Sequence, residues 1–594
     1  MRIDERIEKL RKLMKERGIA GYIIADSDPH MGEYVSEHWR MRKWISGFTG
    51  SAGVVVITHS ASGLWTDGRY YIQAERELAG SGIKLFRSGE SGVPSYTKWL
   101  ADNLSEGDTI GICGLYSSLK EVRDLKAYME KKGIQVVTEY DLVSDIWENR
   151  PPIPHEPVFI HAKKYTGYSA KEKLDIVRSK LREKEASYYL IASLDDIAWL
   201  YNIRGNDIPY NPVTISYAFI SQDDAKLFID PSKVSKDVAD ELKGNGIDIE
   251  EYISIEDRLP ELIDSCGSVY IDPNKMNFRL YSILKNIGCN IIEGRNITTD
   301  LKAVKNEVEV ANLKETLVKD GVAMVKFLYW LDKNVASEKI TELDAARKVD
   351  ELRSEQEGNR GPSFNSISAY GANAAMMHYA PTEDINSTLE EKGMYLLDSG
   401  GQYLGGTTDI TRTVILGPIS DRERRDFTLV LKGHIALAKI KFLYGATGSN
   451  LDVLARQPIW EYGIDYKCGT GHGVGYFLNV HEGPQNLSQR VNNVVLKAGM
   501  IVTNEPGIYI EGKYGIRTEN MMLVVEDELT DSGQFMRFEP ITYCPIDIDG
   551  IDVSLLNEEE REWLNSYHSR VYKKLSPYLN DEEKNWLRGA TREI

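Results

Sequence analysis

The sequence of 594 residues contains few cysteines and no long apolar segment. Its five cysteines are scattered and form no C-x-x-C pair, so the sequence indicates neither a disulfide framework nor a thiolate zinc site. These residues are Cys113, Cys266, Cys289, Cys468 and Cys544. No segment approaches the ~18 consecutive apolar residues that a membrane-spanning helix needs. We therefore expect a protein of the reducing cytoplasm without a membrane partner.

An excess of positive charge is also missing. Lys and Arg number 72 against 90 Asp and Glu, which gives a net charge of -18. Because nucleic-acid-binding proteins neutralise phosphates with basic side chains, this balance argues against a nucleic-acid partner. Residues 1–10 alternate charges along an amphipathic helix and lack the apolar core of a signal peptide.

The first half of the chain repeats one order of predicted elements. Hydrophobic periodicity predicts a helix, a strand and two further β-rich runs in each copy. The matching elements are helices before Gly18 and at 171–184, first strands at 21–25 and 188–192, and later strands at 53–57, 64–67, 217–220 and 226–229. We predict an α/β (α+β) protein with two duplicated domains, each with a mixed sheet, at residues 1–150 and 151–303. The proline-rich segment 150–154 is the predicted linker between them.

A third domain is predicted at residues 304–545, with long helices that bury Met324, Phe327 and Leu328. Beyond it, residues 546–594 read as a short helical tail. Asn557 before three glutamates is a typical helix start. Apolar residues then recur at helical spacing and predict a buried face, formed by Trp563, Leu564, Tyr567, Val571 and Leu575.

The segment 469–484 has the composition of a binding site. His472 and His481 stand nine residues apart, and glycines at 469, 471, 473 and 475 surround the first of them. Glycine lets a backbone approach a ligand closely. Between the histidines, residues 476–480 read as a short buried strand or turn. Taken alone, the segment is equally typical of a glycine-rich loop beside two structural histidines.

Carboxylates recur in pairs on either side of this segment. Asp398 and Asp409 flank a glycine-rich turn, and Glu505 and Glu519 stand fourteen residues apart in a stretch of the same kind. Such turns allow the two members of each pair to face each other across adjacent strands. Together with His472, the pairs predict a pseudo-symmetric site with four oxygen ligands and one imidazole.

Four carboxylates cannot be buried together without compensation, because like charges at close range raise each other's pKa and oppose folding. A pair of divalent cations resolves the conflict. Hard carboxylates with a single histidine suit Mn²⁺, with Co²⁺, Fe²⁺ or Zn²⁺ as alternatives. The simpler alternative, that each acid is only a turn residue, stays open for any one of them. The segment 507–514 falls short of a phosphate-binding loop, because Tyr514 replaces the required Ser or Thr.

The five candidate ligands stand in the order and approximate spacing of the metal ligands of the pita-bread metallopeptidases. Within that group the chain resembles the long, three-domain aminopeptidase P branch, similar to its cytosolic eukaryotic form. Residues 64–74, 377–379 and 469–484 and the helical tail carry the resemblance, which covers nearly the full length.

The resemblance implies a role for each ligand. Asp398 holds one metal, His472 and Glu505 hold the other, and Asp409 and Glu519 bridge both. A hydroxide between the metals attacks the scissile carbonyl, and Glu505 also takes the proton of the attacking water.

The resemblance also implies substrate contacts. His378 and His481 contact the peptide together with His472 and stabilise the tetrahedral intermediate. An exposed loop histidine and a capping or core histidine remain the alternatives for His378 and His481. Arg69 reaches the substrate or forms a structural salt bridge, and Arg517 orients ligands more readily than it binds substrate.

The implied activity is hydrolysis of the bond between an N-terminal residue and a penultimate proline, so peptides of that kind are the expected partners. A prolidase restricted to X-Pro dipeptides and a non-catalytic peptide-binding module are the alternatives. A metal-free, creatinase-like reaction is disfavoured because all five ligands are present. A homodimer is expected from the family alone.

Overall fold

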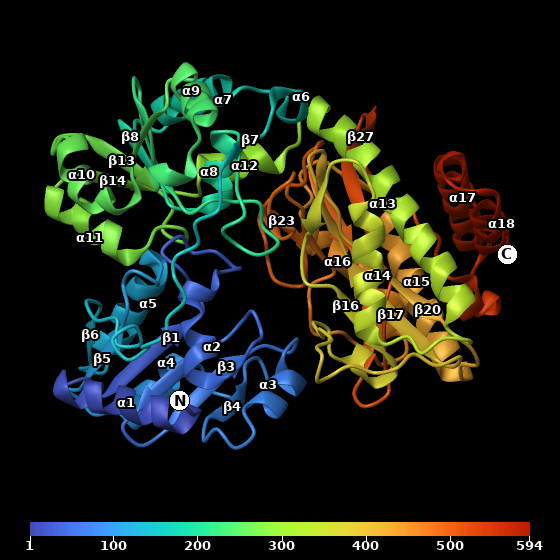
Figure 1. Ribbon diagram of the computed structural model, residues 1–594, viewed down its shortest axis with the longest axis horizontal. Helices are drawn as coiled ribbons and strands as arrows, with labels where there is room; N and C mark the ends of the chain where they lie inside the picture. The colour runs from blue at the N-terminus through green and yellow to red at the C-terminus, as the bar shows by residue number, and fades with distance from the viewer. The chain divides into compact units, whose positions relative to one another are not determined.

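The computed structural model describes residues 1–594 and divides into two compact units (Figure 1). Unit 1 comprises residues 1–162 and 168–300, and unit 2 comprises residues 163–167 and 301–594. Helix α12 (Ile297–Ala303) contains the boundary between them. None of the helices combines the length and the apolar character that crossing a membrane requires.

Unit 1 contains two six-stranded sheets with the same internal order. The first runs β4-β3-β2-β1-β5-β6 and the second runs β12-β11-β10-β8-β13-β14. In the first sheet, β1 pairs antiparallel with β2 and parallel with β5. In the second, β8 pairs antiparallel with β10 and parallel with β13. Matching order and matching direction confirm the predicted duplication with mixed sheets.

The elements of the first copy follow the predicted apolar periodicity. Helix α1 buries Ile7, Leu10 and Met14 on one face. Its strands are β1 (Gly21–Ala25), β2 (Val54–Thr58), β3 (Ser62–Thr66), β4 (Lys84–Arg87), β5 (Thr109–Ile112) and β6 (Gln135–Val137). Its helices are α1 (Ile3–Glu16), α2 (Met41–Ser46), α3 (Tyr71–Glu77), α4 (Tyr96–Asn103) and α5 (Leu119–Glu130).

The second copy begins at α7, where Ser169 and Glu172 form a reciprocal capping box that fixes the helix start. Its strands are β8 (Tyr188–Ile191), β10 (Tyr217–Ser221), β11 (Ala225–Ile229), β12 (Asp248–Glu251), β13 (Ser268–Ile271) and β14 (Asn290–Glu293), with a small pair β7 (Phe159–Ile160) and β9 (Ile203–Arg204). Its helices are α7 (Ala170–Glu183), α8 (Leu194–Leu200), α9 (Lys236–Gly244), α10 (Ile255–Leu262) and α11 (Phe278–Ile287).

Unit 2 is built on a six-stranded sheet, β21-β28-β27-β24-β22-β23, and a three-stranded sheet, β16-β17-β20. The strands of these two sheets are β16 (Ile367–Tyr370), β17 (Met394–Ser399), β20 (Ile410–Ile415), β21 (Lys441–Leu443), β22 (Gly471–Gly473), β23 (Glu482–Leu487), β24 (Ile501–Asn504), β27 (Asn520–Thr530) and β28 (Gly533–Pro540). Shorter strands are β15 (Asn359–Pro362), β18 (Gly401–Tyr403), β19 (Gly406–Thr407), β25 (Gly507–Ile510) and β26 (Tyr514–Arg517).

Long helices bury the apolar faces of these sheets. The helices of unit 2 are α6 (Lys163–Thr166), α13 (Glu307–Asn334), α14 (Glu342–Ser354), α15 (Asp421–Ala438), α16 (Gly448–Trp460), α17 (Glu558–Leu575) and α18 (Asp581–Ala590). Leu317 of α13, Leu431 of α15 and Leu564 of α17 share one buried cluster with strand residues Ile501 and Leu523. The tail helices thus complete the core of unit 2, and Figure 1 shows them at the C-terminus.

Two local expectations are refined. Trp563 is only partly buried and packs against the core of unit 2, whereas the other four predicted tail residues are buried. Of the two alternatives for residues 476–480, the turn is the one present: they form mostly buried bends between β22, which ends at Gly473, and β23, which begins at Glu482.

Candidate metal centre

The four predicted carboxylates lie where paired strands of unit 2 begin or end. Asp398 is the penultimate residue of β17, and Asp409 directly precedes its antiparallel partner β20. Glu505 directly follows β24, and Glu519 directly precedes β27, with Asn504 and Asn520 paired between those strands. Each pair therefore faces across adjacent strands, as the sequence predicts.

His472 lies on β22, beside β24 in the six-stranded sheet. Its Nε2 is 3.3 Å from Asp409 Oδ2 and 3.5 Å from Glu505 Oε1. Its Nδ1 is 2.9 Å from the carbonyl oxygen of Gly473, which can only accept a hydrogen bond. With the Nδ1 proton donated there, Nε2 is the nitrogen that faces the carboxylates and could bind a cation.

The glycines around His472 serve a purpose different from the expected one. A Cβ at Gly471 would lie 2.0 Å from the carbonyl oxygen of Thr503, and one at Gly473 would lie 2.1 Å from that of Glu482. The sequence reading assigned these glycines to close approach of a ligand. In the structure they permit close approach of the neighbouring strands β24 and β23, which brings His472 beside the carboxylates.

The charges of this site are crowded. Ligand atoms of Asp409, His472 and Glu519 all lie within 4.8 Å of one another. Burial, reinforced by Asp409 and Glu505 and only partly offset by Arg517, raises the pKa of Asp398 to about 7. Burial and the same two carboxylates raise the pKa of Glu519 well above its ordinary value. The site therefore favours an added positive charge.

The donor set fits divalent cations. Asp398 Oδ1 is buried and has no hydrogen-bond partner, which marks an acceptor directed at something other than protein. Carboxylates with one imidazole suit Mn²⁺ and the neighbouring first-row metals. Burial lowers the pKa of His472, but hydrogen bonding to Asp409 and the charge of Glu505 raise it overall to about 9. A cation at this place would meet donors of Asp409, His472 and Glu519, with Glu505 3.5 Å from His472.

Known proteins resemble this chain over its whole length. Aminopeptidase P2 of Arabidopsis thaliana is 39% identical over 632 aligned positions, covering 100% of this chain and 89% of its own. A probable Xaa-Pro aminopeptidase P of Talaromyces marneffei is 40% identical over 608 positions, covering 99% and 92%. The model of metallopeptidase family M24 matches residues 311–526. The chain belongs to metallopeptidase family M24.

Other parts of this M24 chain match as well. Creatinase/Prolidase N-terminal domain models match residues 6–141 and 149–309, and the C-terminal region of peptidase M24 matches residues 534–594. A solved structure of X-prolyl aminopeptidase from Caenorhabditis elegans, described as a cytosolic enzyme with a di-nuclear active site, superposes with a TM-score of 0.96 at 36% identity and covers 100% of both chains. The resemblance to aminopeptidase P and the predicted fold are confirmed, and the chain is a metal-dependent hydrolase.

Arg517 is a buried partner of the predicted ligand Asp398. Its guanidinium lies 2.5 Å from Asp398 Oδ2 and also donates to Tyr509 Oη at 2.7 Å and Thr411 Oγ1 at 3.0 Å. It approaches the carbonyl of Met377 at 3.5 Å, directly before His378. This geometry suits the predicted orienting role, and contact with substrate stays a prediction.

Two threonines that the sequence analysis missed also hold predicted ligands in place. Thr503 Oγ1 accepts the backbone N–H of His472 at 3.0 Å and donates to Glu505 Oε1 at 3.1 Å. Thr411 Oγ1 donates to Glu519 Oε2 at 2.7 Å. Thr411 follows Asp409 by two positions and Thr503 precedes Glu505 by two, which places each on the same strand face as its neighbour. That spacing was the available signal.

The sequence analysis also missed two buried residues, Arg412 and His434, that lie behind the predicted ligand Glu519. Arg412 is buried and donates to the Glu519 carbonyl at 2.6 Å, to Asn520 Oδ1 at 2.8 Å and to Tyr567 Oη of the tail at 3.0 Å. His434 lies 3.2 Å from Asn520 Nδ2, and burial and Arg412 lower its pKa to about 3. A neutral imidazole therefore accepts there. Nothing in the sequence signalled these partners.

The remaining predicted residues divide between the two units. His481 meets His472 edge to face, with ring centroids 4.3 Å apart. His378 lies on the loop that passes Arg517. Arg69 belongs to unit 1, where it pairs with Asp67 at 2.8 Å, so the salt bridge that was its alternative reading is present. Its contact with substrate stays a prediction.

Proposed function

We propose that this chain is a metalloaminopeptidase that hydrolyses the bond between an N-terminal residue and a penultimate proline. The observation that carries the proposal is its likeness to the X-prolyl aminopeptidase structure, which extends over 100% of both chains and so includes both N-terminal domains and the tail. A proline amide lacks an N–H and has a fixed φ, so a dedicated enzyme must accept its ring.

Two divalent cations, with Mn²⁺ favoured by the donor set, are proposed as the resident metals. Asp398 would hold one, His472 and Glu505 the other, and Asp409 and Glu519 would bridge both. When bound, such a pair polarises a carbonyl and lowers the pKa of water to ~7.

The side chains around this centre are proposed to divide the remaining work. Glu505, held by Thr503, takes the proton of the attacking water. His378 and His481 donate hydrogen bonds to the oxyanion of the tetrahedral intermediate and contact the peptide beside His472. Arg69 is proposed to bind the substrate, and Arg517 to orient Asp398 through its charge-assisted contact.

Hydrolysis of three short peptides tests the function. Protein stripped of metal and reloaded with Mn²⁺, Co²⁺ or Zn²⁺ is given Arg-Pro-Pro, Arg-Pro and Arg-Ala-Ala. Release of arginine from Arg-Pro-Pro alone supports the proposal and identifies the useful metal. Cleavage of Arg-Pro alone would make the chain a prolidase, and silence on all three with metal bound would favour a peptide-binding role.

A cytosolic location and a homodimer complete the proposal. The first is supported by the cytosolic description of the C. elegans protein. The second is an expectation from the family. Light scattering on the purified protein decides it, because a mass near 67.2 kDa would indicate a monomer and contradict it.

A further inference from the structure

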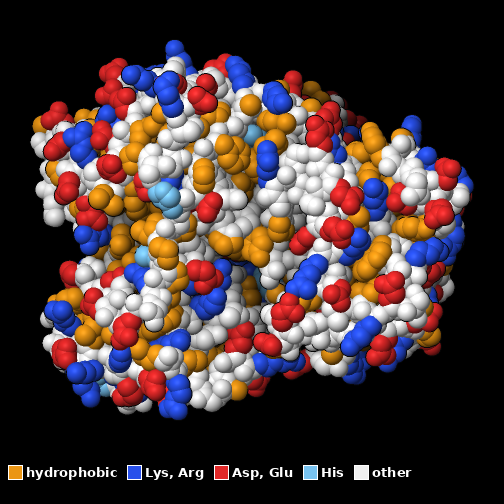
Figure 2. Space-filling view, in the orientation of Figure 1, with side chains coloured by type: hydrophobic (Ala, Val, Ile, Leu, Met, Phe, Trp, Pro, Cys, Tyr) orange, Lys and Arg blue, Asp and Glu red, His pale blue; other side chains and the backbone are white.

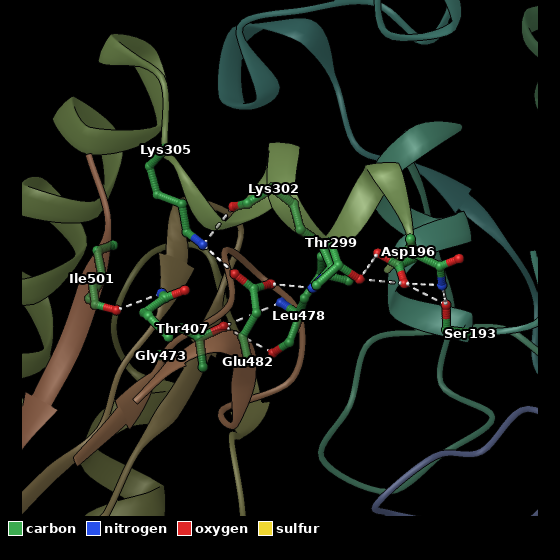
Figure 3. A network of polar contacts seen from close by, with 12 residues as sticks. Ser193, Asp196, Thr299, Lys302, Lys305, Thr407, Gly473, Leu478, Glu482 and Ile501 are labelled. Carbon is green, nitrogen blue, oxygen red and sulfur yellow. Dashed lines mark hydrogen bonds and ion pairs between the residues drawn. The ribbon is translucent and has the colours of Figure 1, made fainter. Parts of the chain in front are cut away.

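A buried cluster of opposite charges lies directly beside His481. Glu482 Oε2 is 3.1 Å from Lys302 Nζ, and Glu482 Oε1 pairs with Lys305 Nζ. All three side chains are at most 2% exposed. Figure 3 shows the two lysines reaching the carboxylate from the same segment of chain. Ion pairs this deeply buried are costly to form unless hydrogen bonds and geometry compensate, so their presence here requires an explanation.

The segment that carries Lys305 is also held by contacts that do not involve Glu482. The backbone N–H of Lys305 donates to the Gly499 carbonyl at 2.9 Å, and Val304 forms a β-bridge with Met500, one residue before β24. Lys305 Nζ also donates to the carbonyl of Lys302 at 2.8 Å. The Lys305 segment is thus anchored beside the sheet that carries His472.

Glu482 directly follows His481, so a fixed Glu482 also restrains the backbone of His481. It is the first residue of β23 and pairs with Gly473, which follows His472. On the other side of His481, the carbonyl of Leu478 accepts from Gln402 Nε2 at 2.7 Å and from Thr407 Oγ1 at 3.1 Å. Figure 3 shows Thr407 beside Leu478 and Glu482 beside the lysines. The backbone on both sides of His481 is therefore held.

We propose that Glu482, clamped by Lys302 and Lys305, is a positioning residue that sets the place of His481 against His472. This inference rests on the proposed function, because it assigns His481 a part in the reaction. The clamp acts through backbone geometry, and the lysines do not contact the substrate themselves. A displacement of about 1 Å at such a group can cost on the order of a hundredfold in rate.

The chain offers a matched set of variants. Lys305→Met removes one ammonium and leaves Glu482 its Lys302 partner, so it is milder than Glu482→Gln, which leaves two buried cations facing a neutral amide. Lys305→Arg keeps the charge and is the rescue variant. Lys314→Met is the control, because Lys314 pairs with Glu539 at 2.8 Å in the same unit but is 36% exposed.

A double-mutant cycle measures the energetic coupling between Lys305 and His481. We expect Lys305→Met to lower kcat/KM for Arg-Pro-Pro at least tenfold, and Lys305→Arg to recover most of it. In a His481→Ala background, Lys305→Met should cost less than about twofold. Equal losses in both backgrounds would overturn the proposal, as would a His481→Ala variant with full activity. Lys314→Met should leave kcat/KM unchanged.

A second readout does not depend on activity. The chain has 10 histidines, so ¹³C-labelled histidine ring signals are few enough to assign by substitution. We expect Lys305→Met to shift the signals of His481 and His472, and Lys314→Met to shift neither. Unshifted signals would refute the clamp. If instead the signals shift but no peptide is cleaved by the unaltered protein, the proposed function fails while the positioning stands.

Discussion

The carboxylates of the metal centre are not equivalent in their protein contacts. Asp398 meets the guanidinium of Arg517, whereas Glu519 accepts a hydrogen bond from the neutral hydroxyl of Thr411. Asp409 lies against His472. These differences arise from the elements that surround each acid, and they give the members of the ligand set separate consequences when removed.

Substitution of single ligands distinguishes bridging from terminal carboxylates. We expect Asp409→Ala to abolish both metal sites, because a bridging acid serves both cations, and Asp398→Ala mainly to empty one. Metal content per chain, measured by plasma mass spectrometry after reloading and desalting, checks this. Equal metal content in the two variants would contradict the bridging assignment.

The raised pKa values predict how metal stabilises the fold as pH changes. A carboxyl with a pKa near 7 in the metal-free fold and near 3.8 when unfolded disfavours folding progressively as pH rises through that interval. His472, raised to about 9, contributes stability below pH 6.5 that is lost as pH approaches 9. Both effects weaken the metal-free protein as pH rises.

We therefore expect the difference in Tm between metal-loaded and metal-free protein to widen from pH 5 to pH 8. Metal binding holds the carboxylates ionised, so the loaded protein escapes the loss. Thermal unfolding at both ends of this range measures it. A difference that is constant or narrows with pH would show that other groups dominate.

At the scale of elements, the start of α14 fixes the loop that carries His378. Glu342 is buried and its carboxylate accepts from Tyr370 N at 2.6 Å, Asn373 Nδ2 at 3.0 Å, Tyr379 Oη at 2.7 Å and Ser387 N at 2.7 Å. Donors from four positions of one loop converge on two oxygens. The helix therefore holds the loop through Glu342, and Arg517 of β26 approaches the same loop at the carbonyl of Met377.

Glu342→Gln tests this support. The amide turns one acceptor into a donor that faces N–H or O–H groups, which costs about 1–3 kcal/mol of stability. We expect the KM for Arg-Pro-Pro to rise about tenfold, because His378 is less well placed, while metal content stays the same. Glu423→Gln is the control, since Glu423 also lies in the first turn of a helix, where it accepts from the backbone N–H of Ser420, but its contact is exposed. A lower metal content in Glu342→Gln would mean that the centre itself is disturbed.

At the scale of the molecule, the two units have different architectures. Unit 1 repeats one mixed sheet twice, and unit 2 carries the ligand set together with the tail. Acidic and basic side chains are interspersed with apolar ones over the face in Figure 2. Among the proposed site residues, Arg69 alone belongs to unit 1. Substitution of Arg69 therefore tests whether that unit takes part in substrate binding.

Arg69→Ala should raise the KM for Arg-Pro-Pro and leave metal content unchanged, if unit 1 supplies a substrate contact. Arg87→Ala is the matched control, because Arg87 forms a similar pair with Glu75 at 2.9 Å in the same unit. Steady-state kinetics on both variants measures the effect. A purely structural role for the Arg69–Asp67 pair predicts a lower Tm without a change in KM.

The sequence by itself determined the types and order of the candidate ligands and the duplicated domains. Asp398, Asp409, Glu505 and Glu519 were recognisable because each stands beside a strand-like apolar run and a glycine-rich turn. Helix α13 was foreseeable from its buried Met324 and Phe327. Local periodicity and turn chemistry act over a few residues, so they are readable without a fold.

Only the tertiary structure decided which groups support the site. Arg412 and Tyr567 meet across 155 positions, and Lys305 and Glu482 across 177. The glycines beside His472 proved to admit neighbouring strands, which no local pattern states. Partners at such separations come together only when sheets and helices pack, because hydrogen bonds depend on distances and angles that the order of residues does not specify.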